Sequence, residues 1–210
     1  MIKGILIDFG GTIDSDGIHW FNAFSDAYAI VADIPKELLW DAYVHTERTL
    51  GRNPIIQPTD SFCKTLQTKI ALQTEYLQQH GITVTAQDTI LDTCYNKVVK
   101  HISTVSKPVL ERLSAQYPMV LVTNFYGNMH TVLKEFGLDH LFKDVVESAV
   151  VGVRKPDPQI FRLGVAVLGL EPQETVMIGD SQEKDILPAQ SIGCQTIQIT
   201  PSSPMSSFPL

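Results

Sequence analysis

The chain has 210 residues, a formal net charge of −7, and 44% hydrophobic and 19% charged residues. This length allows one substantial hydrophobic core, or a core with a small second lobe, and the composition is ordinary for a soluble globular protein. No run of Lys or Arg occurs, which argues against nucleic-acid binding, and an anionic ligand would need a bound cation or a few well-placed bases.

The first predicted element is a buried strand at residues 2–7, with the sequence IKGILI. Asp8 interrupts the apolar run, which is therefore too short for a signal peptide or a membrane span. The strand leads into DFGGT at residues 8–12, where a carboxylate is followed closely by a glycine pair. Glycines suit a tight turn and let the backbone approach a ligand closely.

The stretch 18–104 is predicted to be a helical cap that is inserted after the first strand. It has little strand signal, and apolar residues recur at helical spacing, as in Trp20, Phe24, Ala27 and Val31, and in Ile90, Cys94 and Val98. The remaining parts are a core formed by 1–15 and 105–200, and a Pro/Ser-rich irregular tail at 201–210. Because a cap has two connections to its core, we expect it to act as a lid.

Strands and helices alternate in the rest of the chain. Apolar runs predict strands at 119–123, 143–150, 175–180 and 195–199. Helices are predicted before and between them, at 108–116, 128–136, 157–168 and about 184–192. This alternation is typical of an α/β protein with a doubly wound parallel sheet.

The three cysteines match neither a disulfide framework nor a zinc site. Cys63, Cys94 and Cys194 are widely spaced and odd in number. Reduced thiols are typical of cytosolic proteins, so we expect a cytoplasmic location.

Polar side chains follow the ends of the predicted strands. Asp8 follows the first strand, Thr123 and Asn124 end the second, and Asp180 lies at the end of another. Lys155 and Asp185 lie near the starts of the helices that follow later strands. Since ligands of an open parallel sheet bind at the carboxyl ends of its strands, these side chains are expected to converge. Carboxylates suit magnesium, and hydroxyl, ammonium and backbone N–H groups suit a phosphate.

These residues form four motifs. The motifs and their order along the chain resemble those of the haloacid dehalogenase (HAD) superfamily of hydrolases. The resemblance covers 1–15 and about 105–200. Asp8 matches the family's nucleophile and Thr12 the threonine of the same motif. The other three motifs are matched by Thr123, by Lys155, and by the acidic pair Asp180 and Asp185. The resemblance implies a Rossmann-like core with a helical cap.

The implied reaction is magnesium-dependent phosphoryl transfer, through an aspartyl-phosphate on Asp8, from a small phosphorylated metabolite. No nucleic-acid or membrane partner is expected. The implied catalytic residues are Asp8, Thr123 and Lys155. Substrate contacts are assigned to Thr123, Asn124, Lys155 and Gly11. The implied Mg²⁺ ligands are Asp8, the backbone carbonyl of Gly10, Asp180 and Asp185.

Gly10 departs from the family's pattern. Most phosphatases that the sequence resembles have a second Asp at this position, which protonates the leaving group and then activates water. Glycine does neither, and general acid–base catalysis typically contributes roughly 10² to 10⁴ in rate. A phosphatase without this acid would be slow, would act on substrates with good leaving groups, or would use water or a cap residue as the acid. Asp14, Asp16 and His19 are the nearest candidates in sequence.

Two other interpretations remain open. A dehalogenase or phosphonatase would also lack the acid. The acidic pair argues for a metal, however, whereas dehalogenation looks metal-free in this family. A phosphonatase would need a Schiff-base lysine from the cap, and the sequence does not single out one of Lys36, Lys64 and Lys69. A protein that binds a phosphorylated ligand without turnover is the alternative from another class.

The cap residues Arg48 and Arg52 could meet a substrate anion, although solvated helix-end arginines explain them more simply.

Overall fold

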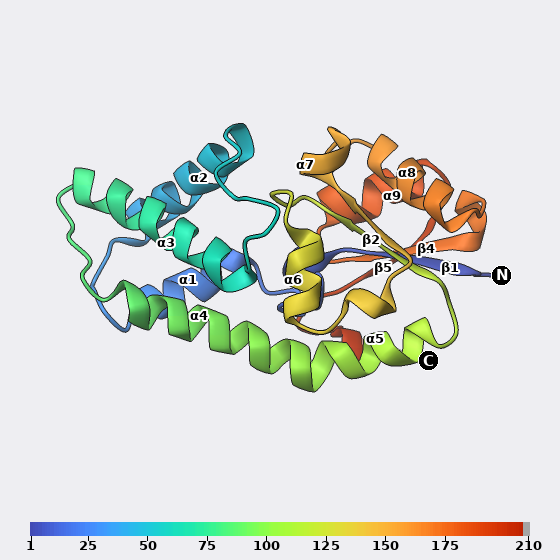
Figure 1. Cartoon of the computed structure of the whole chain (residues 1–210), viewed down its shortest axis with the longest axis horizontal. Helices are drawn as coiled ribbons and strands as arrows, with labels where there is room; N and C mark the ends of the chain where they lie inside the picture. Colours follow the sequence, from blue (N-terminus) through green and yellow to red (C-terminus); the bar gives the residue numbers. More distant parts are fainter. Residues whose placement is uncertain (208–210) are drawn as a thin grey trace.

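The computed structural model describes residues 1–207. One sheet of five parallel strands has the order β3-β2-β1-β4-β5 (Figure 1). The strands are β1 (Gly4–Ile7), β2 (Met119–Thr123), β3 (Asp144–Glu147), β4 (Thr175–Gly179) and β5 (Gln195–Gln198). The prediction of a doubly wound parallel sheet is therefore confirmed.

Helices precede, connect and flank the strands. They are α1 (Trp20–Tyr28), α2 (Lys36–Arg52), α3 (Phe62–Gln79), α4 (Gln87–His101), α5 (Lys107–Ser114), α6 (Met129–Glu135), α7 (Ser148–Val151), α8 (Gln159–Leu168) and α9 (Leu187–Ser191). Short helical turns lie at Phe9–Ile13, Ile102–Ser106, Asp139–Leu141, Pro172–Glu174, Gln182–Ile186 and Met205–Ser207. Within residues 1–207, none of the helices combines the length and the apolar composition that a bilayer crossing requires.

Apolar side chains alternate between the two faces of the sheet. On β1, Ile5 and Ile7 belong to the same buried cluster as residues of α5 and α6, whereas Leu6 packs in a separate cluster with residues of α8 and α9. The strands β1, β2 and β4 are buried along their whole length, as expected for strands that are covered on both faces. Burial of each such side chain contributes about 1.5–3 kcal/mol.

The helices α1 to α4 lie together at one end of the sheet (Figure 1). Their buried residues include Phe24, Leu66, Ile70 and Ile90, which follow the helical spacing expected from the sequence. The long helix α4 continues through the turn Ile102–Ser106 into α5 and so connects this group to the sheet. The carboxyl ends of the strands face the same group of helices.

The predicted strand at 143–150 is wrong for its last three residues. The strand β3 ends at Glu147, and Ser148 begins the short helix α7. The carboxylate of Glu147 accepts hydrogen bonds from the backbone N–H groups of Gly127 and Met129, at 2.6 and 3.2 Å. These bonds order the loop after β2. The predicted tail also differs in detail, because Met205 is buried in a helical turn, and residues 208–210 lie outside the described residues.

Candidate active site

The strand β1 places Asp8 at the centre of the sheet's carboxyl edge. Its neighbours in the sheet are β2 and β4, and the backbone N–H of Asp8 donates to the carbonyl of Ile178 at 2.9 Å. The side chain is buried. A carboxylate in this position is held by the buried central strand of the sheet.

Lys155 connects Asp8 to Asp185. Its Nζ lies 2.6 Å from Oδ1 of Asp8 and 2.6 Å from Oδ1 of Asp185. The second oxygen of Asp185 accepts from the backbone N–H of Ser181 at 3.0 Å. All three charged residues of this network are buried. Burial alone would lower the pKa of Lys155, but Asp8 and Asp185 outweigh it and raise that pKa, so the ammonium stays charged.

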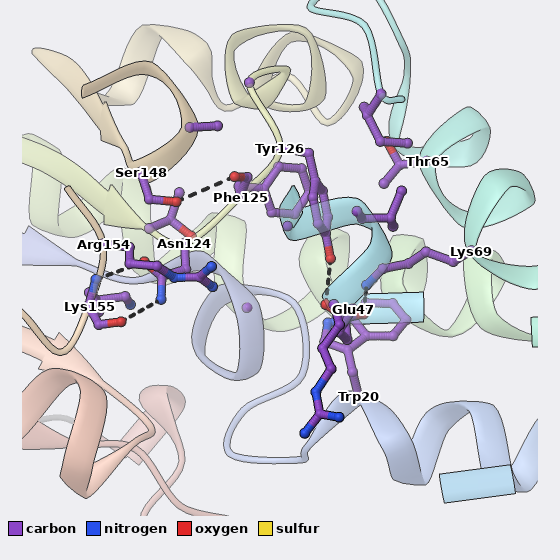
Figure 2. Close-up of a pocket in the computed structure, with 18 of the residues that line it drawn as sticks. Trp20, Glu47, Thr65, Lys69, Asn124, Phe125, Tyr126, Ser148, Arg154 and Lys155 are labelled. Atoms are coloured by element: carbon purple, nitrogen blue, oxygen red, sulfur yellow. Dashed lines mark hydrogen bonds and ion pairs between the residues drawn. The ribbon is translucent and has the colours of Figure 1, made fainter. Parts of the chain in front are cut away.

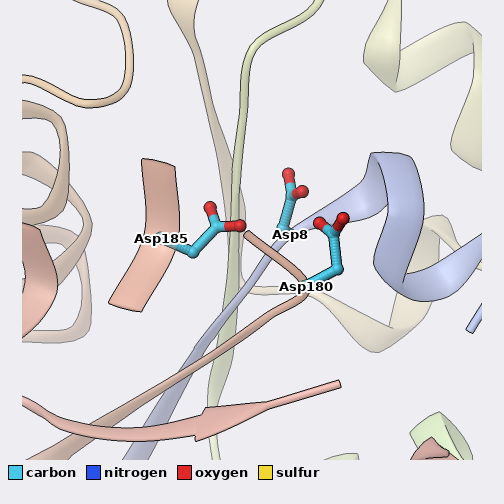
Figure 3. A group of neighbouring side chains, drawn as sticks. All are labelled: Asp8, Asp180 and Asp185. Carbon is cyan, nitrogen blue, oxygen red and sulfur yellow. The ribbon is translucent and has the colours of Figure 1, made fainter. Parts of the chain in front are cut away.

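Asp180 completes a cluster of three carboxylates. One oxygen each from Asp8, Asp180 and Asp185 lies within 4.8 Å of the others (Figure 3). Burial, with the neighbouring carboxylates, raises the pKa of Asp8 to about 7 against the opposing effect of Lys155, and burial raises that of Asp180 to about 6. One ammonium does not balance three carboxylates, whose donor atoms are the hard oxygens that Mg²⁺ prefers. The cluster therefore fits the implied metal.

Thr123 and Asn124 extend the site from β2. Thr123 is buried at the end of this strand and lines the same cavity as Asp8. The Asn124 amide is occupied by the backbone of Lys155, because it donates to the Lys155 carbonyl at 3.0 Å and accepts from the Lys155 N–H at 2.9 Å. The structure thus gives the Asn124 side chain a positioning contact in addition to its place in the cavity wall.

The two glycines of DFGGT differ in how strictly the structure requires them. Gly11 has a φ of 86°, and a Cβ added there would lie 2.4 Å from Oδ2 of Asp180. Gly10 has a φ of −75° and a ψ of 120°, and no atom lies within 4 Å of an added Cβ. Only Gly11 is required by the backbone and by its neighbours.

Replacing Gly11 with Ala should destabilise the protein by about 1–3 kcal/mol, because the new methyl group is strained and displaces Asp180. Urea denaturation would measure the change in the free energy of unfolding. Gly10→Ala is the matched control, since the same methyl group meets open space and should cost little. Equal stabilities of the two variants would contradict this explanation of Gly11.

Asp14, one of the candidate acids in the sequence, is buried beside the loop that follows Asp8 and is engaged in hydrogen bonds. Its carboxylate accepts from the Gly11 N–H at 2.7 Å, from the Ser15 hydroxyl at 2.8 Å and from the Trp20 indole N–H at 2.6 Å. Burial raises its pKa to about 6 despite these bonds. Asp14 therefore fixes the loop that follows Asp8. No signal in the sequence showed that Trp20 would return to this loop.

A cavity of about 1110 Å³ opens above the carboxylates. It is lined by all the predicted site residues, namely Asp8, Gly10, Gly11, Thr123, Asn124, Lys155, Asp180 and Asp185, and on the opposite side by residues of α2 and α3. Arg48 and Arg52 also line it, and both are exposed to solvent, as expected from their positions near the end of a helix. Of the lysines in the helical stretch that were considered for a Schiff base, Lys69 lines the cavity, whereas Lys36 and Lys64 are exposed elsewhere.

The three candidates to replace the missing acid differ in position. His19 lines the cavity, whereas Asp14 and Asp16 do not. Asp14 is engaged as described, and Asp16 accepts from the backbone N–H of Met205 at 2.6 Å. Burial lowers the pKa of His19, which therefore has little of the protonated form near neutral pH.

Comparison with known proteins adds to this geometry. The sequence model of the haloacid dehalogenase-like hydrolases matches residues 2–193. A phosphoserine phosphatase of Thermus thermophilus is 38% identical over 63 residues, which are 30% of this chain and 25% of that protein. A glyceraldehyde 3-phosphate phosphatase of Methanopyrus kandleri is 42% identical over 67 residues, or 32% and 29% of the two chains. The match thus spans less than a third of each relative.

Among solved structures, a HAD phosphatase of Thermococcus onnurineus superposes with a TM-score of 0.53 and 23% identity. The superposition covers 95% of this chain and 86% of that one. At this identity the likeness concerns the fold.

Proposed function

This chain belongs to the haloacid dehalogenase-like hydrolase family, and we propose that it is a magnesium-dependent phosphatase of a small phosphorylated metabolite. The observation that carries the proposal is the Asp8 carboxylate, which Lys155 holds at 2.6 Å beside Asp180 and Asp185 in an accessible cavity. Phosphatases among its partial relatives support the same reaction.

In the proposed reaction, a carboxylate oxygen of Asp8 attacks phosphorus, and the bond from phosphorus to the leaving oxygen breaks. The leaving oxygen then takes a proton. Water attacks the phosphorus of the aspartyl-phosphate, which releases phosphate and restores Asp8. Lys155 fixes the orientation of Asp8 and offsets the charge that develops on the phosphoryl oxygens. Thr123 is assigned to the phosphoryl group, whereas the Gly11 N–H already donates to Asp14 at 2.7 Å and holds the loop instead.

Asp8, Asp180 and the Gly10 carbonyl are the proposed metal ligands. Both oxygens of Asp185 already have protein partners in Lys155 and Ser181, so we assign Asp185 to holding Lys155 and the water molecules of the ion. When bound, Mg²⁺ would neutralise charge on the phosphoryl and carboxylate oxygens. We assign residues 18–104 to a cap, because residues of α2 and α3 line the same cavity as Asp8.

Magnesium should stabilise the fold in the absence of substrate, because it relieves repulsion among the three carboxylates. A concentration of about 100 times Kd should add about 2.7 kcal/mol to the free energy of unfolding, which is measured by thermal denaturation. Asp180→Asn should lose most of this shift, and Asp92→Asn, at an exposed position on α4, should keep it. A shift that survives excess chelator, or that is unchanged in Asp180→Asn, would contradict the metal assignment.

The test of function is phosphate release from a panel of phosphorylated metabolites with Mg²⁺, with halide release from 2-haloacids measured in parallel. Phosphate release supports the proposal. Halide release alone would identify a dehalogenase, and binding of phosphorylated compounds without release would identify the non-catalytic alternative. A Schiff base is disfavoured because it requires a neutral amine, whereas Glu47 raises the pKa of Lys69 against the effect of burial. We also propose a cytoplasmic location, since three free cysteines suit a reducing compartment.

A further inference from the structure

A second polar cluster lies in the same cavity (Figure 2). The Nζ of Lys69, on α3, lies 2.7 Å from Oε1 of Glu47, on α2. The hydroxyl of Tyr126, in the loop after β2, donates to Oε2 of Glu47 at 2.7 Å. Figure 2 shows this cluster, which we call the Glu47–Lys69–Tyr126 cluster, on the opposite side of the view from Lys155. The reaction proposed above uses none of these residues.

Fold stability does not explain this cluster well. Lys69 is 7% exposed, and its Nζ lies over the rings of Trp20 and Tyr126, at 5.8 and 5.2 Å from their centroids. Withdrawing an ammonium from water is costly, and a buried ion pair seldom stabilises a fold more than an apolar pair of the same size would. An apolar pair could join α2 to α3 equally well. The position of the charges in the cavity wall therefore indicates recognition of a ligand.

The chemistry of the cluster defines that ligand. Lys69 has three N–H donors, and within residues 1–207 its one polar partner is Glu47. The carboxylate of Glu47 has more acceptor sites than its two partners occupy. Both groups are ionised, since each moves the pKa of the other away from neutrality, so the pair is neutral as a whole. A hydroxyl group satisfies both members of the pair at once, because it accepts from Lys69 and donates to Glu47.

We infer that the Glu47–Lys69–Tyr126 cluster recognises hydroxyl groups on the leaving group of the substrate. This inference rests on the proposed phosphatase function and specifies its substrate class as phosphate monoesters of polyols or sugars. The cavity of about 1110 Å³ slightly exceeds the usual range of about 300–1,000 Å³ for small-molecule sites, so it has room for a sugar-sized leaving group beside the phosphoryl group. Glu47, Lys69 and Tyr126 are then specificity residues, and the chemistry stays with Asp8.

Matched substrates test this inference. Wild-type kcat/KM should be about tenfold or more higher for glycerol 1-phosphate than for propyl phosphate, and for a hexose 6-phosphate than for hexyl phosphate. The double variant Glu47→Leu/Lys69→Met should reduce these ratios to about one while its Tm stays equal or rises. The control Lys64→Met, at an exposed position on the same helix, should keep the wild-type ratios. Retention of the ratios by the double variant would overturn the inference, as would a wild type that prefers alkyl phosphates or phosphoserine.

Two further measurements separate this inference from the proposed function. Acetyl phosphate has no hydroxyl-bearing leaving group, so its hydrolysis by the wild type reports phosphoryl transfer alone. If acetyl phosphate and all other phosphates fail, the proposed function is wrong. The hydroxyl preference is then measured by calorimetry, as the Kd values of the same substrate pairs. These are measured for Asp8→Asn alone and for Asp8→Asn combined with Glu47→Leu/Lys69→Met. Equal Kd values for the hydroxylated and the alkyl members of each pair would overturn the inference.

Discussion

Asp8→Asn is expected to reduce phosphate release by roughly 10³-fold or more, because the amide has no anionic oxygen to attack phosphorus. The substitution conserves shape, and the Lys155 ammonium keeps its contact with Asp185 at 2.6 Å. The loss should therefore concern kcat much more than KM. Initial rates with the best substrate of the panel, at saturating Mg²⁺, measure it. Asp41→Asn, on the exposed side of α2, is the matched control and should retain wild-type rates.

The stability of the same variant separates a functional carboxylate from a structural one. Burial raises the folded-state pKa of Asp8 from 3.8 to about 7, so the folded state holds this proton more tightly than the unfolded chain does. Its contribution to stability is therefore present at low pH and is lost as the pH rises from about 4 to 7. The Asp8→Asn variant has no carboxylate at this position, so its stability should not fall in this way as the pH rises. At pH 8 without divalent cations its Tm should equal or exceed that of the wild type, and a clearly lower Tm would mean that Asp8 serves the fold.

The central part of the site was predictable because its position follows from topology. Parallel strands end at one edge of the sheet, so Asp8, Thr123 and Asp180 had to lie near one another once the apolar runs were identified as strands. The local chain also supplied the turn at Gly11. These predictions needed the order of the elements and no knowledge of how individual side chains pack.

Contacts between side chains on different elements were not predictable from spacing. Glu47 and Lys69 are 22 positions apart on two helices, and no pattern fixes the rotation of one helix against the other. Trp20 reads as a packing residue on an amphipathic helix, yet its N–H holds Asp14. The strand β3 ends at Glu147, whose carboxylate binds the backbone of the loop after β2, and an apolar run does not reveal this contact.

Gly10→Asp should raise kcat/KM for alkyl phosphates by about tenfold or more, within the range typical of general acid catalysis. Alkoxide leaving groups need a proton, which Gly10 does not supply. The backbone there permits the change, because φ is −75°, ψ is 120° and no atom lies within 4 Å of the new Cβ. Gly10 also lines the cavity, so the new carboxyl group would enter the space above Asp8. Rates on paired alkyl and aryl phosphates measure the effect.

Aryl and acyl phosphates should gain much less, since their leaving groups depart without a proton. Gly10→Asn is the matched control, because it has the same shape and cannot act as the acid. Repulsion by another carboxylate next to Asp8, Asp180 and Asp185 would act on alkyl and aryl phosphates alike, so the difference between the two substrate classes reports proton donation. If Gly10→Asp changes alkyl and aryl rates equally, proton donation does not limit turnover in the wild type. A water molecule in the same cavity would then already supply the proton, since His19 is mostly neutral near pH 7.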